Sequence, residues 1–235
     1  MKILPVFLIL FLSGGMIWAQ EKRFVEIPSD NVINYYLTET KAYATLYSGK
    51  TETPYDRRYI NHPYFETDAY KAGTLGYNRV VYKDVMMRFD LYRNELTVVA
   101  PDKPFHIVLN NEKFDYAILN GSTIISAGSE NKRKEKFGVL LHNGTYPVTR
   151  QYNVRTTEET SDRTVINSFR IQQQYVIYKN GVPYAVKNKN SVLKLFPDKR
   201  KELNAFAKQH RLNFKSQIEQ SIIALVEQYG VMVND

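Results

Sequence analysis

The chain has 235 residues, a formal net charge of +8 at pH 7, 18 tyrosines and no cysteine. The absence of cysteine excludes a disulfide-stapled scaffold and lipid attachment through a cysteine thiol. A chain of this length can bury a large hydrophobic core, so we expect one large domain or two small ones.

Residues 1–19 are typical of a secretory signal peptide. Lys2 gives a positive start, residues 3–12 form an apolar run, and Ala19 is a small residue at the expected cleavage site. The apolar run is shorter than a bilayer requires, which favours a cleaved leader over the alternative of a retained anchor. We therefore expect an exported protein, in the periplasm or associated with the outer membrane, with no transmembrane span in the mature chain.

Residues 20–72 are interpreted as an N-terminal lead-in, with a short helix over 32–37 and a first strand over 41–47. Residues 53–72 have no clear period and are rich in tyrosine. The tyrosine ring suits contact with a sugar or a peptide, and it suits the rim of a β core equally well. The candidate ligand-binding residues are Tyr55, Arg57, Tyr59, His62 and Tyr64.

Residues 73–190 are predicted to form an antiparallel β domain, and residues 73–100 give its clearest signal. One side of an extended chain would carry Val85, Met87, Phe89 and Leu91, and the other side Met86, Arg88, Asp90 and Tyr92. This alternation is typical of a half-buried strand. Chain reversals expected at Asn78-Arg79 and Arg93-Asn94 then predict a three-stranded meander.

The alternation continues beyond residue 100. Further strands are expected over 105–110, 114–118, 123–125, 137–141, 146–154, 165–178 and 182–187. Asn-Gly pairs at 120–121, 143–144 and 180–181 predict hairpins, because glycine accepts a positive φ and asparagine tolerates one. Residues 156–162 are predicted to be a polar loop, and a break is expected near 172–174. The expected fold class is mainly β (α+β): an antiparallel meander, sandwich or partly open barrel with a C-terminal helical hairpin.

The helical period begins at residue 191, and residues 191–235 are expected to pack on the sheet as a helical segment. Ser191 and Asp198 are the expected caps of its first helices, and a capping box is expected at Ser216. Gly230 is expected to end the last helix. The apolar stripe of that helix consists of Ile218, Ile222, Leu225, Val226 and Tyr229.

Positive charge is concentrated in residues 179–215, which hold ten lysines and arginines against two acidic residues. Such a cluster on an exported chain attracts lipid headgroups, acidic glycans or the carboxylates of a protein partner. A solvated helical face is the alternative interpretation, and export argues against nucleic acid as a partner. The candidate partner-binding residues are Lys194, Lys199, Arg200, Lys201, Lys208 and Arg211.

Three stretches resemble a set of uncharacterised exported β-rich proteins that are frequent in bacteria of the Bacteroidota phylum. They are residues 73–99, the motif Asn61-His62-Pro63-Tyr64-Phe65, and the tail from 191 to 214. The resemblance covers most of the mature chain. It implies a setting in the cell envelope, and it brings no catalytic residue with it.

The sequence contains no motif that predicts a catalytic or metal site. No histidine has a second ligand at metal spacing, and nucleophile elbows and glycine-rich phosphate loops are absent, so no cofactor or metal is expected. The leading hypothesis is a non-enzymatic exported binding protein, an accessory subunit of a periplasmic or outer-membrane assembly. The alternatives are a glycan-binding module using residues 55–70 and an unrecognised hydrolase with His62 and Asp56.

Overall fold

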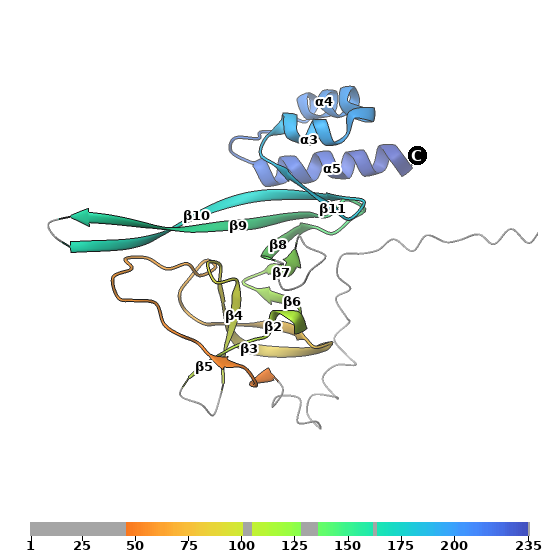
Figure 1. Ribbon diagram of the computed structural model, residues 1–235. Helices are drawn as coiled ribbons and strands as arrows, with labels where there is room; N and C mark the ends of the chain where they lie inside the picture. Colours follow the sequence, from red (N-terminus) through yellow and green to blue (C-terminus); the bar gives the residue numbers. More distant parts are fainter. Residues whose placement is uncertain (1–45, 101–104, 128–135, 162–163, 235) are drawn as a thin grey trace, which may run out of the picture.

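The computed structural model describes residues 46–100, 105–127, 136–161 and 164–234. These residues form an open antiparallel sheet of eleven strands followed by C-terminal helices (Figure 1). The predicted mainly β, α+β class is therefore confirmed. The predicted signal peptide and the helix expected over 32–37 lie outside the described residues. Only Leu46 and Tyr47 of the strand expected over 41–47 are described. Leu46 is helical and Tyr47 lies in a turn, so the predicted strand is wrong at these two residues.

The sheet is largely a meander, because most neighbouring strands are consecutive in the chain. The strands are β1 (Lys50–Thr51), β2 (Lys71–Tyr77), β3 (Val80–Asp90), β4 (Glu95–Val99), β5 (His106–Val108), β6 (Phe114–Leu119), β7 (Ser122–Ala127), β8 (Lys136–His142), β9 (Val148–Ser161), β10 (Thr164–Lys179) and β11 (Val182–Val186). Their order across the sheet is β1-β5-β4-β3-β2-β6-β7-β8-β9-β10-β11. A single 3-10 turn, η1 (Asn111–Lys113), precedes β6.

The predicted meander is formed by β2, β3 and β4. Asn78 and Arg79 both have positive φ, 54° and 63°, as a tight two-residue hairpin requires. The side-chain alternation of β3 changes phase near Asp84, which has a φ of 56°. Val81 and Tyr82 are both buried before this point, and Val85 begins the predicted buried series after it. The series is thus confirmed from Val85 onward.

Two of the three predicted Asn-Gly turns are confirmed. Asn120-Gly121 and Asn180-Gly181 have the paired positive φ values of tight hairpin turns. The third hairpin is also present, because β8 pairs with β9 in antiparallel fashion, but a longer loop from 143 to 147 connects them in place of a two-residue turn. A Cβ at Gly144 would lie 2.4 Å from Nε2 of His142, so a larger residue at this position would require the His142 ring to move.

The longest hairpin joins β9 to β10 and extends past the rest of the sheet (Figure 1). Its register is continuous from the Thr164–Ser161 pair to the Ile177–Val148 pair. The predicted loop over 156–162 is therefore wrong for the part that is described, and so is the break expected within β10. Many residues in the distal half of this hairpin are exposed. The sequence there lacks the alternation of polar and apolar side chains that marks a half-buried strand.

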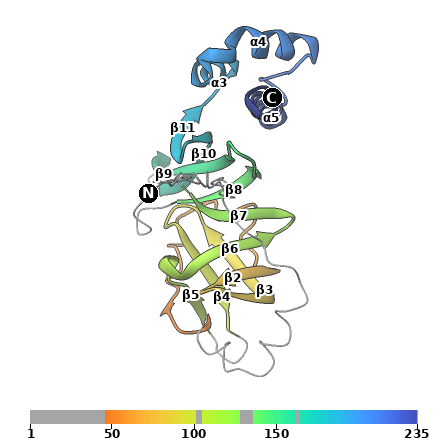
Figure 2. The same cartoon turned by 90° about the vertical axis from the view of Figure 1, so that its right-hand side faces the viewer.

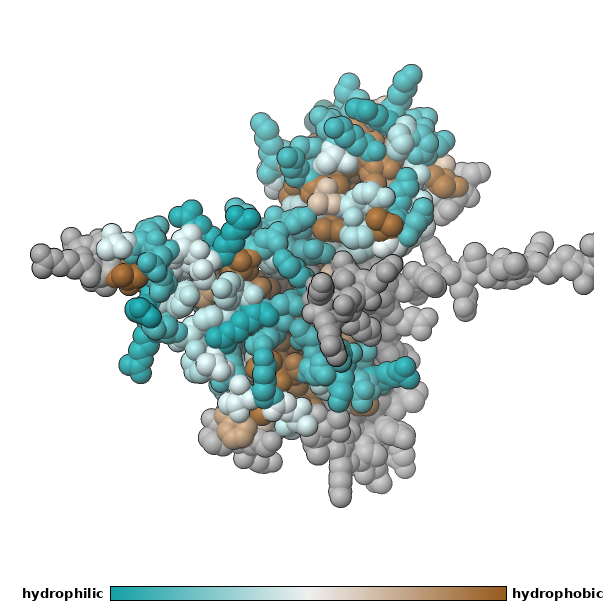
Figure 3. Space-filling model, in the orientation of Figure 1, coloured by the Kyte–Doolittle hydropathy of each residue, from teal (hydrophilic) through white to brown (hydrophobic). Residues whose placement is uncertain are grey.

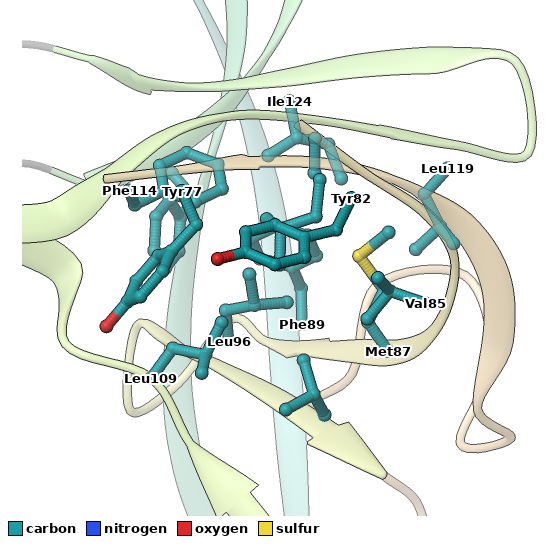
Figure 4. Packing of buried hydrophobic residues seen from close by; sticks show 14 of the residues in the cluster. Tyr77, Tyr82, Val85, Met87, Phe89, Leu96, Leu109, Phe114, Leu119 and Ile124 are labelled. Carbon is teal, nitrogen blue, oxygen red and sulfur yellow. The ribbon is translucent and has the colours of Figure 1, made fainter. Parts of the chain in front are cut away.

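The main hydrophobic core lies on one face of the curved sheet (Figure 4). Phe89, Phe114 and Phe137 meet edge to face there, with ring centroids 4.8 to 5.9 Å apart. Ile124 belongs to this core, whereas the next residue along β7, Ile125, belongs to a smaller cluster. Because successive side chains of a strand point to opposite faces, the smaller cluster lies on the other face.

The C-terminal helices are α3 (Lys189–Leu195), the 3-10 turn η3 (Pro197–Lys199), α4 (Arg200–Gln209) and α5 (Ile218–Asn234). We call residues 189–234 the helical lobe; it stands over the ends of β8 to β11 (Figure 2). Ile222, Leu225, Val226 and Tyr229 of the predicted stripe are at most 5% exposed. They pack with Val148, Tyr175, Ile177 and Val186 of the sheet, which confirms that the lobe packs on it.

The predicted helix ends are mostly wrong. Asn188 caps α3, and Ser191 is the third helical residue, whose side chain completes the capping box. Asp198 does not cap a helix, and its carboxylate accepts a hydrogen bond from Tyr229 instead. Asn213 accepts the Ser216 N–H before α5, and the helix continues through Gly230. Burial of the apolar stripe, which tertiary packing provides, outweighs the weak helix-breaking preference of one glycine.

Candidate functional site

A loop formed by residues 52–70 covers the outer face of β3, which carries Arg88 and Asp90. Two isolated bridges fix the loop: Tyr64 pairs with Asp90, and Tyr59 pairs with Asn167 of β10. The tyrosines of the loop, together with Tyr92 after β3 and Phe169 of β10, form what we call the aromatic cluster: Tyr55, Tyr59, Tyr64, Tyr70, Tyr92 and Phe169. The loop thus makes a polar and aromatic layer opposite the main core.

Arg88 is the centre of one half of this layer. Its guanidinium carbon lies 3.7 Å from the ring centroid of Tyr64 and 4.3 Å from that of Tyr70. The guanidinium also donates to Glu52 at 2.8 Å, and the Tyr70 hydroxyl donates to the same carboxylate at 2.6 Å. Burial alone would raise the pKa of Glu52, but the hydrogen bonds from Tyr70 and Arg88 outweigh it and lower the pKa. Glu52 is therefore held as a carboxylate.

Asp90 is the centre of the other half and is only 2% exposed. One carboxylate oxygen accepts the Tyr55 hydroxyl at 2.6 Å, and the other accepts the backbone N–H groups of Tyr92 and Arg93. Burial raises the pKa of Asp90 despite these bonds. It also raises the pKa of Tyr55. The Arg93 guanidinium lies 3.9 Å from the Tyr55 ring centroid and donates to the Thr53 carbonyl.

The loop also binds the edge of β10. The Ile60 N–H donates to the Asn167 carbonyl, and the Asn167 N–H donates to the Arg58 carbonyl, both at 3.1 Å. The Asn61 side-chain amide then bonds both backbone groups of Phe169, at 2.7 and 2.9 Å. The Tyr59 ring is stacked on Phe169, with centroids 4.4 Å apart. These contacts satisfy an edge that would otherwise be open.

The structure brings together four of the five residues predicted to bind a ligand. Tyr55, Tyr59 and Tyr64 belong to the aromatic cluster, and their rings contact one another or Phe169. Arg57 is exposed and separate from these contacts. His62 stacks on Tyr64, and its Nδ1 accepts the Tyr64 N–H.

The two residues proposed for a hydrolase make separate hydrogen bonds. The Asp56 carboxylate accepts two side-chain hydrogen bonds from Arg58. His62 has its hydrogen bond with the backbone of Tyr64. The arrangement provides no shared proton path between Asp56 and His62.

Sequence reasoning missed the residues that connect the loop to the sheet. Glu52 and Phe169 are distant in the chain from Arg88 and Asp90, and no local pattern joins them to these two residues. The one available signal was that Arg88 and Asp90 share the polar side of a predicted strand. Tyr64 and Phe169 are buried, and Tyr55, Tyr59 and Tyr70 are half-buried, so these rings contribute to packing. Tyr92 is the most accessible residue of the cluster, at 45% exposed.

The six predicted partner-binding residues lie on or beside α3 and α4. Lys194, Arg200, Lys201, Lys208 and Arg211 are exposed, and Lys199 is half-buried. Among the described residues, none of these six cations has a carboxylate partner within salt-bridge distance. We call this set the basic face. Its charge is therefore available to a binding partner.

The helical lobe that carries the basic face is anchored to the sheet by polar contacts. Arg150 of β9 donates to Glu219 of α5 at 2.6 Å, and the Tyr175 hydroxyl donates to the same carboxylate. Lys179 of β10 donates to the carbonyl of Leu195 at the end of α3. These bonds supplement the apolar packing and hold the basic face in one orientation.

A separate open hollow of 520 Å³ lies beside β1 and β5, and Lys50, Glu95, Asn110 and Asn111 are among its lining residues. Lys50 and Glu95 form an ion pair across it at 2.5 Å. In the described part of the chain, no three His, Cys, Asp or Glu residues are grouped to hold a metal ion. Nor is any described helix long and apolar enough to cross a membrane.

A scan against protein-family models, a search of curated proteins and a search of solved structures found no match to the chain. The functional argument therefore depends on the geometry of the residues above.

Proposed function

We propose that this chain is a non-enzymatic exported binding protein, an accessory subunit of a periplasmic or outer-membrane assembly, and that it binds an acidic protein partner through the basic face. The observation that carries the proposal is the set of six cations without carboxylate partners in the described structure. Exposed charges contribute little to folding stability, whereas complementary charges speed association and orient a partner.

The surrounding sequence also supports an acidic partner. Residues 194–211 hold the six cations and two acidic residues, Asp198 and Glu202. The Asp198 carboxylate accepts a hydrogen bond from Tyr229, which directs it toward α5. A partner that presents several carboxylates would therefore meet a predominantly positive surface on a fixed helical frame.

Chemical crosslinking of envelope fractions tests this proposal. A lysine-reactive reagent should trap one defined partner through Lys194 to Lys215. Changing Arg200 and Arg211 to Gln removes charge but no reactive amine, and it should weaken the product. Arg57→Gln with Arg155→Gln is the matched control, because both arginines are exposed and lie outside the helical lobe. Recovery of monomer alone from intact cells would contradict the proposal.

Glycan binding at the aromatic cluster is a second candidate, favoured by the accessible ring of Tyr92 above Tyr55 and Phe169. An exposed aromatic ring can stack on a sugar face. Affinity electrophoresis in gels containing polysaccharides should then show retardation that Tyr92→Ala removes. If no polysaccharide of a broad panel slows migration, this candidate fails.

A further inference from the structure

The hairpin of β9 and β10 has one edge that is covered and one that is not. On the β10 side, the loop over β3 binds the edge through Tyr59 and Asn61. On the β9 side, the ladder with β8 ends at Gln151, so residues 153–161 have no strand beside them among the described residues. We call residues 153–161 the edge segment. It projects past the rest of the sheet in Figure 1, and this projection is largely hydrophilic in Figure 3.

Every second residue of the edge segment points its backbone groups away from β10. The N–H and carbonyl groups of Asn167 bond to the loop and not to β9, and Glu158 lies directly opposite Asn167 in the ladder. Opposite residues of an antiparallel ladder either bond each other or both point outward, so the Glu158 groups face the uncovered edge. The pattern repeats every two residues and includes Val154, Thr156 and Thr160. In the described part of the chain these groups have no backbone partner, which leaves a template for a further strand.

The charges of the edge segment are self-complementary in one register. Arg155 and Glu159 are both exposed and lie four residues apart, on the same face of the strand. Around a two-fold axis at Thr157, Arg155 of each copy lies opposite Glu159 of the other copy. Of the possible two-fold registers, only this one places opposite charges directly across from each other within the edge segment. Registers centred on Arg155, Glu158 or Glu159 place like charges opposite each other, which disfavours them.

Arg155 lacks a carboxylate partner of its own. Its neighbour across the β9–β10 ladder is Arg170, a like charge, and no described carboxylate lies within salt-bridge distance of Arg155. Glu159 lies 3.6 Å from Arg170, but the two side chains are 71% and 67% exposed, so this pair contributes little to stability. A second copy would therefore supply each Arg155 with the carboxylate that its own chain does not.

We propose that two copies of this chain associate through their edge segments, which pair antiparallel about a two-fold axis at Thr157 and join the two sheets. The outward backbone groups of Thr156 bond Glu158 of the second copy, and those of Val154 bond Thr160 of the second copy. Residues 155, 157 and 159 then form the non-hydrogen-bonded pairs, whose side chains are closest. The paired stretch ends at Asn153, before β8 begins to cover β9.

Disulfide formation tests this register, because the chain contains no cysteine. In Thr157→Cys, the two thiols of a dimer face each other across the axis, at the separation that a disulfide requires. We expect mild oxidation to convert most of this variant to a covalent dimer. Thr160→Cys is the matched control, since it is exposed on the same strand and its two copies would lie about 20 Å apart. Equal yields from the two variants, or monomer alone from Thr157→Cys, would overturn the proposal.

Charge reversal tests the ion pairs, with sedimentation velocity as the measurement of self-association. Arg155→Glu places like charges opposite each other twice in the dimer and should weaken association about tenfold. Adding Glu159→Arg to this variant should restore association, and added salt should weaken the parent dimer. Circular dichroism verifies that each variant is folded. A parent chain that stays monomeric at about 100 μM, or a double variant no better than Arg155→Glu alone, would overturn the proposal.

The dimer contact and the basic face can be tested separately. Arg57→Gln with Arg155→Gln, the control for partner crosslinking, removes the cation of the edge segment and leaves the basic face unchanged. It should therefore form less dimer and still give the crosslinked product with the partner. Loss of self-association together with retention of that product would distinguish the two contacts, whereas undiminished self-association would contradict the role of Arg155.

Discussion

The loop over β3 and the basic face use their charged side chains in opposite ways. Arg88 is stacked between two tyrosine rings and paired with Glu52, and each of these contacts also fixes the loop. Arg200 and Lys201 are exposed and have no carboxylate partner in the described structure. The tyrosines and charged residues of the loop over β3, which suggest a ligand-binding site in the sequence, contribute to packing. The cations of the basic face, for which a solvated helical face was the alternative interpretation, remain accessible.

The largest expected effect comes from Arg88→Ala. The change removes the cation between Tyr64 and Tyr70 and leaves the Glu52 carboxylate, whose side chain is 7% exposed, without its guanidinium partner. Breaking such a buried pair costs about 3–5 kcal/mol of unfolding free energy. Urea unfolding followed by circular dichroism measures this loss, with the exposed Arg57→Ala as control. A loss no greater than that of the control would show that the cluster does not stabilise the loop.

Asp90→Ala should have the next largest effect. It leaves the Tyr55 hydroxyl and the N–H groups of Tyr92 and Arg93 without their acceptor. We expect a decrease of about 2–3 kcal/mol in unfolding free energy, because buried donors would lose their partners. The same urea titration applies, and the exposed Asp68→Ala is the control. Equal stability of the two variants would contradict the anchoring role of Asp90.

Asn61→Ala tests the edge of β10 alone. Losing the two amide bonds to Phe169 should cost about 1–2 kcal/mol. Hydrogen exchange should become faster at the Phe169 and Ile60 N–H groups, while the β2–β3 amides keep their protection. Uniformly faster exchange would indicate global destabilisation rather than release of the loop.

Glu52 should give the protein a pH dependence of stability. Its pKa is lowered in the folded state, so its stabilising contribution is present above the unfolded value of 4.5 and is lost as pH falls from there through the folded pKa. Asp90, whose pKa is raised by burial, contributes with the opposite sign. Glu52→Gln should therefore flatten the decline of unfolding free energy below pH 4.5, as measured by urea titrations across this range. If the unfolding free energy of the variant falls with pH as steeply as that of the parent chain, Glu52 is not the source of the decline.

The smallest expected effect on stability is on the basic face. Lys201→Gln with Lys208→Gln removes two exposed charges and should change the unfolding free energy by no more than about 0.5 kcal/mol. A large decrease in unfolding free energy would show that these lysines stabilise the fold as Arg88 does. The two regions would then not differ in how they use their charges.

Local sequence patterns predicted the strands that have one apolar face and one polar face. The series Val85, Met87 and Phe89 marked β3 because one face of the strand is apolar and the other is largely polar. The pairs at Asn120 and Asn180 marked turns because their φ values are a local requirement. The distal part of β9, residues 155–161, was missed because its side chains are polar on both faces of the strand.

The candidate site was predictable only in part. Tyrosine density identified the loop, but Arg88 and Asp90 acquire their roles from rings and a carboxylate far away in the chain. The basic face was predictable as a composition, since its residues are neighbours on α3 and α4. Whether their charges are neutralised by carboxylates from elsewhere is a property of the folded chain.

The sequence by itself determined the antiparallel strands, the tight turns and the amphipathic stripe of α5, because side-chain alternation, positive φ and helical period act between near neighbours. Only the tertiary structure decided which polar groups are satisfied, since burial and hydrogen bonding join residues such as Asn61 and Phe169 that are distant along the chain. The same physical reason separates the packed aromatic cluster from the accessible cations of the helical lobe.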